Sequence, residues 1–379
     1  MDKNVSYKCD VSTERIDAWR AEGKLAIGTV CCHAPFELIH AAGAMPVRMR
    51  AAGCGLCADS DAYLGNDTCG FTKGILQNLI DGVYHLDGMV TSNGCNTAPG
   101  IYTNWDGIAR ERGLKQFFFE FAAPTMLNAA SERYFGGQMA DLRDDLEKYT
   151  GKKITDDMVR ESIRTYNTAR AMVHEVYELR KADAPVLSGA EALKATLMAT
   201  QMPIEEYIEY MKTFLADVKS RTETLDHPLR VMLVGSALDD PQYVQAIENE
   251  GLLVVADLNS FGTRFLRDEL VCGDDEDVFD ALGRHYLNRS SCPRFQDGSD
   301  TIHEYILNAA KEYKVDGIIV ERLKYCQKWE GESQVLQALF NEHDIPCLQL
   351  DRDEKMDAQG QFSIRVEAFR EMLEGRKED

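Results

Sequence analysis

The chain has 379 residues, of which 44% are hydrophobic and 28% are charged, the composition of an ordinary globular protein. No apolar run approaches the roughly 18 to 20 residues of a transmembrane helix, and the first residues lack the apolar stretch of a secretory signal, so we expect a cytoplasmic protein without a membrane partner. The 42 Lys and Arg residues stand against 63 Asp and Glu residues, a net charge of −21. Such a surface repels phosphates, which argues against a general role in nucleic-acid binding.

The first part of the chain has an α/β pattern. Short apolar runs predict strands at 25–30, 45–49, 86–91 and 116–121, and the spacing after Pro35 predicts a helix. From about 131 to 226 the pattern is almost entirely helical, with Asp156 as a predicted N-cap. The α/β pattern then resumes, with predicted strands at 231–235, 252–256, 315–320 and 346–350 and with helices after Pro241 and at 301–313, 333–340 and 362–373. We therefore predict a first α/β lobe with an N-terminal helix (1–130), a helical connector (131–226) and a second α/β lobe (227–379).

The two α/β segments follow one plan. In each, a proline comes ten residues after the start of the first strand, and an Asp-Gly pair opens a later strand, at Asp87 and at Asp316. Each Asp-Gly strand is followed by a cysteine, Cys95 or Cys326, and each is preceded by a helix with a cysteine placed at its start, Cys69 or Cys292. Generic likeness between βαβ units is the alternative. We favour a duplicated architecture because the cysteines recur at corresponding strand ends and helix starts.

The positions of these cysteines indicate a binding site, because ligands of open parallel sheets bind at the carboxyl ends of the strands. Helix starts add backbone N–H groups and a dipole that favour negative charge. A thiolate-bound iron–sulfur cluster is anionic and suits this setting. Two similar lobes that face each other would bring Cys69, Cys95, Cys292 and Cys326 to one cleft.

Cys54 and Cys57 form a Cys-x-x-Cys pair after the second predicted strand. Alone, this pair fits a redox dithiol, half of a zinc site or cluster ligands. Zinc would need a second closely spaced pair, which the sequence lacks. The same segment formally matches a dinucleotide-binding fingerprint, which we discount because a convincing acidic residue about twenty positions on is missing. The chain also has no phosphate-binding loop of the Gly-x-x-x-x-Gly-Lys type, so we expect no ATP hydrolysis by this chain itself.

The sequence contains 11 cysteines. Disulfides are disfavoured because a chain of this length needs no covalent cross-links and has no export signal. Cys347 is predicted to be a core residue, Cys9 and Cys272 surface thiols, and Cys31 and Cys32 less favoured ligands. Six thiols then remain in loops or at element ends: Cys54, Cys57, Cys69, Cys95, Cys292 and Cys326. Six ligands are too many for one cubane cluster, but two cubanes with three cysteines each, joined by a shared atom, would use all of them.

At these residues the sequence resembles the iron–sulfur component family of 2-hydroxyacyl-CoA dehydratases and benzoyl-CoA reductases. The resemblance spans nearly the whole chain and is carried by 35–46, by Thr68-Cys69-Gly-Phe-Thr-Lys, by the two Asp-Gly strands with Cys95 and Tyr325-Cys326, and by 345–351. It implies two flavodoxin-like lobes with a cluster in the cleft between them. It also implies a [4Fe-4S] cluster on Cys69, Cys95 and Cys326, reduced by a separate ATP-hydrolysing [4Fe-4S] activator.

Two departures from ordinary dehydratase subunits indicate the double-cubane proteins of this family. Asn96 follows Cys95 where Asp is frequent, and Cys54, Cys57 and Cys292 are additional thiols. We therefore expect a homodimeric low-potential reductase with an [8Fe-9S] cluster, which acts on small molecules. The alternative is a [4Fe-4S] subunit of a heterodimeric acyl-CoA dehydratase or aromatic-CoA reductase. A third alternative is an activator or electron store without a substrate of its own.

Other candidate site residues lie near the predicted thiols. Glu37 and His33 follow the first strand and are candidates to relay protons, although for Glu37 we favour capping or pairing at its helix start. Asn96 and Tyr325 flank two of the cysteines and are candidates to contact the cluster or its ligands. Trp105 and Trp329 are predicted to be packing residues.

Overall fold

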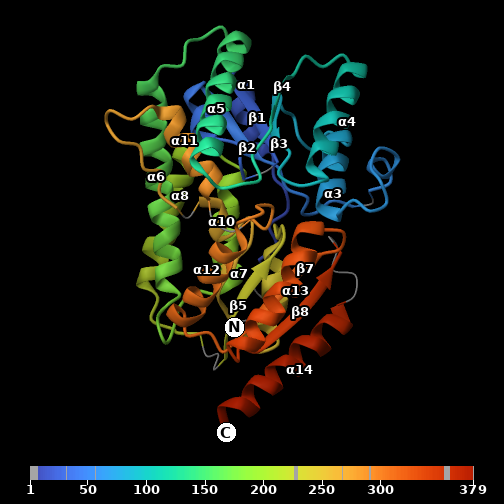
Figure 1. Ribbon diagram of the computed structural model, residues 1–379, viewed down its shortest axis with the longest axis vertical. Coiled ribbons are helices and arrows are strands. Elements are labelled where there is room, and N and C mark those ends of the chain that lie inside the picture. The colour runs from blue at the N-terminus through green and yellow to red at the C-terminus, as the bar shows by residue number, and fades with distance from the viewer. Residues whose placement is uncertain are drawn as a thin grey trace.

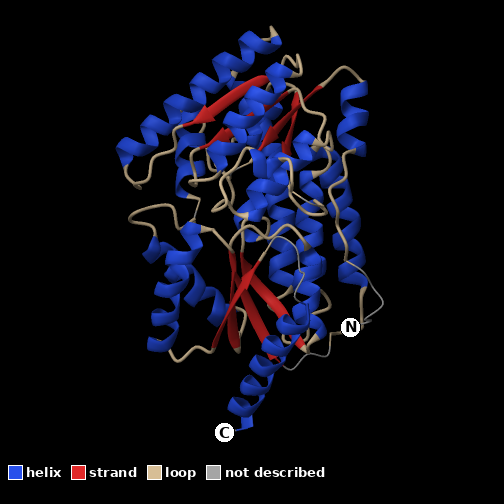
Figure 2. Cartoon of the chain, turned by 90° about the vertical axis from the view of Figure 1, so that its right-hand side faces the viewer, coloured by secondary structure: helices blue, strands red, loops and turns tan. Residues whose placement is uncertain are grey.

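The protein, described here from a computed structural model, contains two four-stranded parallel sheets separated by helices (Figures 1 and 2). The structure describes residues 7–30, 32–55, 57–225, 229–266, 268–289, 292–353 and 359–378. The first sheet has the order β2-β1-β3-β4, and its strands are β1 (Leu25–Thr29), β2 (Ala44–Arg48), β3 (Gly88–Ser92) and β4 (Phe117–Phe121). The second has the order β6-β5-β7-β8, and its strands are β5 (Leu229–Gly235), β6 (Leu252–Leu258), β7 (Gly317–Leu323) and β8 (Cys347–Arg352).

The two sheets repeat one topology, because in each the second strand of the lobe lies outside the first and the third lies on its other side. Asp87 and Asp316 mark the equivalence. Asp87 accepts a hydrogen bond from the backbone N–H of Ala26 at 2.9 Å, and Asp316 accepts one from the N–H of Arg230 at 2.7 Å. The N–H of each aspartate in turn donates to the carbonyl of the same partner residue. The prediction of two parallel-sheet lobes of similar plan is confirmed.

Helices cover both sheets, and several of them lie where the sequence predicts a helix. In the first lobe they are α1 (Glu14–Ala21), α2 (Phe36–Ala41), α3 (Gly70–Ile80) and α4 (Ala98–Glu111). The connector contains α5 (Ala129–Thr150), α6 (Asp156–Leu179), α7 (Gly189–Leu197) and α8 (Ile204–Ser220). The second lobe carries α9 (Pro241–Asn249), α10 (Thr263–Leu266), α11 (Val278–Asn288), α12 (Ser299–Glu312), α13 (Gln327–Glu342) and α14 (Gln359–Glu378). Short 3-10 turns lie at Ser60–Ala62 and Met198–Thr200.

One predicted helix start is wrong by a residue. Thr155, not Asp156, is the N-cap of α6, because Thr155 has an extended backbone and its hydroxyl accepts from the N–H of Met158 at 3.3 Å. Asp156 is the first residue of the helix, where its negative charge interacts favourably with the positive end of the helix dipole. The predicted boundary between the connector and the second lobe, at 226 and 227, lies outside the described residues.

Helix α11 was not predicted and connects distant parts of the chain. It lies within the second lobe in sequence but packs against α5 of the connector, and its Phe279 and Leu282 share a buried cluster with Phe117 and Phe121 of the first sheet. The helices approach very closely where Gly136 and Gly283 meet, since a Cβ on Gly283 would lie 2.5 Å from the backbone nitrogen of Gly136. The helices thus form a shared layer over the first sheet (Figure 1). None of the helices in the described ranges combines the length and the apolarity needed to cross a lipid bilayer.

Candidate functional site

The loops after the strands of one sheet contact the loops after the strands of the other. The Arg48 guanidinium, at the end of β2, lies 4.2 Å from the ring centroid of Phe261, which follows β6. Asn96, after β3, donates a hydrogen bond to the side-chain oxygen of Gln327, after β7. The carboxyl ends of both sheets therefore face each other, which is where parallel sheets with this strand order bind ligands.

Three of the predicted thiols lie at helix starts in this region. Cys69 is the N-cap of α3, Cys326 is the N-cap of α13, and Cys95 precedes the N-cap of α4 by two residues. The three helices have 11, 16 and 14 residues, long enough for their unpaired N–H groups and dipoles to favour an anion at these ends. Two of the three thiols thus come from the first lobe and one comes from the second.

Hydroxyl and amide groups surround the first two of these thiols. The Cys69 sulfur lies 3.4 Å from the Thr72 hydroxyl, and the Cys95 sulfur lies 3.5 Å from that of Thr97. The two hydroxyls are 2.9 Å apart, so they connect the two thiols. The backbone N–H of Ala98 also donates to the Cys95 sulfur at 3.3 Å. Sequence reasoning missed both threonines, although their positions beside each cysteine, three and two residues on, offered a signal.

The three thiols lie close enough to influence one another electrostatically. Burial raises the pKa of Cys69, and the neighbouring Cys95 adds to this effect. Burial raises the pKa of Cys326 to about 12, with further contributions from Cys69 and Cys95 and an opposing hydrogen bond from the backbone of Trp329. Without a cation, the thiols of Cys69 and Cys326 hold their protons at neutral pH. Positively charged iron would displace the protons and favour thiolates.

Cys54 and Cys57 form a second thiol group beside the first. Their sulfur atoms are 3.6 Å apart. Cys54 packs on α3, because a Cβ on Gly74 would lie 3.4 Å from the Cys54 Cβ and 2.8 Å from that of Ala51. The glycine at 74 therefore lets the loop lie against the same helix that begins at Cys69.

The second lobe fixes the loop that leads to Cys54. One carboxylate oxygen of Asp239 accepts hydrogen bonds from the backbone N–H groups of Ala51 and Ala52, at 2.7 and 2.9 Å. Asp239 follows β5 and is 1% exposed. No sequence pattern identifies Asp239, since its partners are more than 180 residues away.

Cys292 belongs to a different electrostatic environment. Burial raises its pKa to about 11, Cys32 adds to the increase, and the guanidinium groups of Arg264 and Arg294 oppose it. The sequence placed Cys292 at a helix start, which is wrong: α12 begins only at Ser299. The reason is that 292–298 forms a turn, in which the Arg294 guanidinium lies over the Phe295 ring. Cys31 lies outside the described residues.

Arg264 lies between this environment and Cys326. Its guanidinium donates to the carbonyl of Gly235 at the end of β5, at 2.8 Å, and lies 5.2 Å from the centroid of the Trp329 ring. Trp329 contributes the backbone hydrogen bond to Cys326. Arg264 therefore influences the pKa of Cys292 and lies beside the tryptophan that hydrogen-bonds to Cys326. Trp329 and Trp105 are each 3% exposed, as expected for packing residues.

The two candidate proton carriers are both buried. Glu37 forms an ion pair with Arg170 at 2.5 Å and accepts a hydrogen bond from Tyr286 at 2.6 Å. His33 is 2% exposed and packs edge-on against Phe135 and Phe295, and burial lowers its pKa. Glu37 thus connects α2 to α6 and α11, and His33 stays neutral at physiological pH.

The residues that flank Cys95 and Cys326 lie at the surface. Asn96 is exposed and bridges to Gln327 of the second lobe. Tyr325 is 55% exposed and has φ +66°, a left-handed conformation that is unusual for a tyrosine. Lys324 pairs with Asp353 at 2.7 Å.

Among the remaining described cysteines, Cys9 does not lie where the sequence predicts. Cys9 was expected at the surface, which is wrong: it is 7% exposed, its carbonyl accepts from Arg50, and its sulfur contacts Gln201 at 3.7 Å. Its partners lie far along the chain, so local polarity was misleading. Cys272 is half-buried and contacts Arg160 at 3.1 Å. Cys347 is the first residue of β8 and packs against the core of the second lobe.

The donor set has the chemistry of an iron–sulfur site, because it consists of thiols with hydrogen-bonding groups close to sulfur. Within the described ranges, no three His, Cys, Asp or Glu side chains are arranged to hold one metal ion. The thiols of Cys69, Cys95 and Cys326 lie at three helix ends in a common region, with threonine hydroxyls beside two of the sulfurs and backbone N–H groups that donate to Cys95 and Cys326. Thiolate ligands with such hydrogen bonds are typical of iron–sulfur clusters.

Comparison with known proteins gives one consistent result. Residues 31–373 match the family model described as 2-hydroxyglutaryl-CoA dehydratase, D-component. The chain is 25% identical to one of the subunits of benzoyl-CoA reductase from Thauera aromatica, over 91% of this chain and 92% of the relative. It is 25% identical to the beta subunit of (R)-2-hydroxyglutaryl-CoA dehydratase of Acidaminococcus fermentans, over 94% of each chain. It is 22% identical to the beta subunit of lactoyl-CoA dehydratase of Anaerotignum propionicum, again over 94% of each.

Proposed function

Because the chain belongs to the 2-hydroxyglutaryl-CoA dehydratase D-component family, we propose that it is an iron–sulfur enzyme component that transfers low-potential electrons. The observation that carries the proposal is the position of Cys69, Cys95 and Cys326 at three helix starts, within electrostatic reach of one another. These three thiols would hold a [4Fe-4S] cluster. Such a cluster, when bound, supplies one-electron chemistry at low potential.

The finer proposal is a double-cubane [8Fe-9S] cluster, held by six thiols. Cys54 and Cys57 support it, because their sulfurs are 3.6 Å apart and Cys54 packs on the helix that begins at Cys69. Cys292 would be the sixth ligand. It is half-buried, and its pKa is influenced by Arg264, whose guanidinium lies 5.2 Å from the Trp329 ring centroid, and by Cys32. A double cubane stores two electrons, which suits even-electron reductions of small molecules.

The chain's own residues have definable roles in this proposal. The hydroxyls of Thr72 and Thr97 and the N–H of Ala98 would donate to the thiolates of Cys69 and Cys95, which stabilises their charge. The Asn96–Gln327 hydrogen bond would hold the two lobes together at the outer edge of the thiols. Glu37 and His33 as proton carriers, and Tyr325 as a group that shields Cys326, stay predictions.

The partners in this proposal are a second copy of the chain and an ATP-hydrolysing [4Fe-4S] activator. The net charge of −21 supports a transient, orientation-dependent encounter, since the activator must approach the cluster through a less acidic part of the surface. The helices α5 to α8 are the proposed dimer contacts.

A second candidate function follows from the relatives. Two of them are named as beta subunits of acyl-CoA dehydratases and one as part of a benzoyl-CoA reductase. Under this proposal the chain would hold a single [4Fe-4S] cluster on Cys69, Cys95 and Cys326 and would work with a different partner subunit.

Iron and sulfide analysis of anaerobically purified protein separates the two. About eight irons per chain supports the double cubane, and about four supports the single cluster. Cys292→Ala should lower the iron content by about half under the first proposal and leave it unchanged under the second. Cys347→Ala is the matched control, because Cys347 begins a strand of the second sheet. Retention of all iron by Cys69→Ala would contradict both.

A further inference from the structure

The residues that follow Cys292 form a turn that is attached to the first lobe. Pro293 suits the second position of a turn because its ring fixes φ, and the backbone N–H of Phe295 donates to the Cys292 carbonyl at 3.5 Å. The next N–H, of Gln296, donates to the carbonyl of Thr125 at 2.9 Å. The turn therefore belongs to the second lobe by chain order but is hydrogen-bonded to the loop after the last strand of the first sheet.

Arg294 contacts both the thiol and the first lobe. Its backbone N–H donates to the sulfur of Cys292. Its guanidinium donates to the carbonyl of Ala123 at 3.3 Å and to that of Pro124, and it lies 4.4 Å from the centroid of the Phe295 ring. Arg294 is only 4% exposed, so these contacts are shielded from water. One residue thus connects the position of the sulfur to the position of the first lobe.

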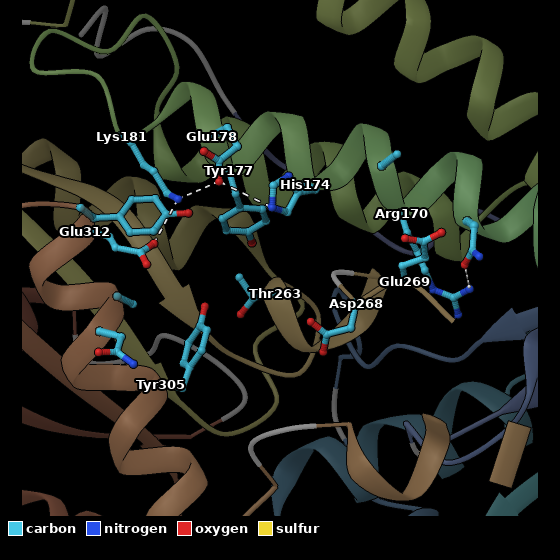
Figure 3. A pocket seen from close by; sticks show the side chains of 15 residues that line it. Arg170, His174, Tyr177, Glu178, Lys181, Thr263, Asp268, Glu269, Tyr305 and Glu312 are labelled. Carbon is cyan, nitrogen blue, oxygen red and sulfur yellow. Dashed lines mark hydrogen bonds and ion pairs between the residues drawn. The ribbon is translucent and has the colours of Figure 1, made fainter. Parts of the chain in front are cut away.

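The charge of Arg294 is buried without the usual partner. Other buried guanidinium groups pair with carboxylates: Arg170, which lines a cavity between α6 and α12 (Figure 3), with Glu37 at 2.5 Å, and Arg352 with Glu321 at 2.7 Å. Arg294 instead donates to carbonyl groups, and within the described part of the chain its Nε N–H has no acceptor. A buried charge without an opposite charge nearby destabilises a folded protein. An anionic cluster at the adjacent thiol would supply that opposite charge.

We propose that Arg294 is a positioning residue for Cys292, which holds the turn on the first lobe and balances the negative charge of the cluster. The second role rests on the proposed function, in which Cys292 is a cluster ligand. The first role does not, because the contacts with Ala123 and Pro124 are present without a cluster. The two roles can therefore be measured separately.

Alkylation of Cys292 by iodoacetamide tests the positioning role in the full-length chain before cluster reconstitution. Peptide mass spectrometry follows the reaction at Cys292, and circular dichroism checks that each variant is folded. Arg294→Gln should increase the alkylation rate at least about tenfold, because the turn is no longer held by the two carbonyl contacts and opens more often. Arg294→Lys retains the charge and one donor and should increase the rate less.

Arg143→Gln is the matched control. The Arg143 guanidinium also lies over a phenylalanine ring, 4.6 Å from the centroid of Phe279, but its charge is paired with Asp144. This variant should change the alkylation rate of Cys292 less than about twofold.

Potentiometric titration of the reconstituted protein tests the charge balance. Arg294→Gln should lower the midpoint potential by at least about 59 mV, the equivalent of a tenfold change in the ratio of reduced to oxidised cluster for a one-electron couple. Arg294→Lys should change this ratio less than about twofold, because it retains the positive charge, and a role in folding alone would not show this rescue. Iron analysis of the same samples distinguishes a shifted potential from a lost cluster.

Parental alkylation of Cys292 in Arg294→Gln would overturn the positioning role. Equal shifts of potential in Arg294→Gln and Arg294→Lys, or in Arg294→Gln and Arg143→Gln, would overturn the charge balance. A parent protein that binds no iron would reject the proposed function together with the charge balance. The alkylation rates would still decide the positioning role in that case.

Discussion

Arg50 and Asp239 come from opposite lobes and form a buried pair, with each side chain 1% exposed and with Arg50 Nε 4.0 Å from Asp239 Oδ2. A second guanidinium nitrogen of Arg50 donates to the Asp239 carbonyl at 2.6 Å. Arg50 also donates to the Cys9 carbonyl within its own lobe, and Asp239 accepts from the N–H groups of Ala51 and Ala52 across the lobes. The pair therefore orients the loop toward Cys54.

Asp239→Ala should destabilise the protein and loosen this loop. The substitution leaves the Arg50 charge buried without its carboxylate and frees two N–H groups, a loss of about 3–5 kcal/mol in the free energy of unfolding. Urea unfolding measures the loss, and alkylation of Cys54 and Cys57, followed by mass spectrometry, should become faster. Asp239→Asn should restore slow alkylation, because its amide oxygen still accepts from Ala51 and Ala52. Equal alkylation rates in all three proteins would contradict the positioning role.

Asn96→Asp should lower the midpoint potential of the proposed cluster. The substitution adds a negative charge beside Cys95 and replaces the amide that donates to Gln327 with an acceptor. Potentiometric titration of the reconstituted protein measures the shift. Asn341→Asp adds the same charge at the far end of α13 and serves as the control. A shift of the same size in both variants would assign the effect to overall charge.

Glu248 should make stability depend on pH. Burial raises its pKa to about 7, although the N–H groups of Gly189, Ala190 and Val254 oppose the increase. Between about pH 4.5 and 7 the Glu248 carboxyl is ionised in the unfolded chain but keeps its proton in the folded protein. The stability that the protonated carboxyl contributes below about pH 4.5 is therefore lost as the pH rises through 7. A shift of this size corresponds to about 3 kcal/mol.

Glu248→Gln should remove this part of the pH dependence. Denaturant unfolding at several pH values between 4.5 and 8 measures it, and Glu304→Gln, an exposed substitution, should retain the slope of the parent protein. A parent protein whose stability rises steadily over the same interval would show that the hydrogen bonds to Glu248 outweigh its burial.

Gly283→Ala should destabilise the contact between α5 and α11. The added Cβ would lie 2.5 Å from backbone of Gly136, so the helices must move apart at a cost of about 1–3 kcal/mol. Gly137→Ala is the matched control, because it lies in α5 with nothing within 4 Å of its added Cβ. It should instead stabilise by about 0.5–1 kcal/mol, since alanine favours helix. Thermal unfolding compares the two, and equal effects would contradict the close packing.

The sequence predicts the strands well because parallel strands buried on both faces read as continuous apolar runs. All eight predicted runs overlap strands of the structure, within a few residues. Helix α11 was missed although Val278, Phe279, Leu282 and Tyr286 carry a helical period and Asp277 caps it. The α/β alternation directed attention to strands, and the partner of this helix lies more than 130 residues away.

For the candidate site, the sequence identifies residue types but not their partners. Cys69, Cys95 and Cys326 are predicted from their places after strands and at helix starts, which are local features. The contacts of Cys9, Asp239 and Cys292 are decided by residues from other lobes, and no local pattern encodes them. The influence of Cys32 on the pKa of Cys292 is therefore a tertiary property.

The route of α11 has a consequence for access to the thiols. The helix belongs to the second lobe by chain order, yet it is seated against α5 over the first sheet. A hinge rotation that moved the two sheets apart would have to break the contact between Gly283 and Gly136 or extend the chain on both sides of α11. Solvent and small reactants would then reach the interior by rearrangement of short loops at the periphery, with the two halves remaining in place.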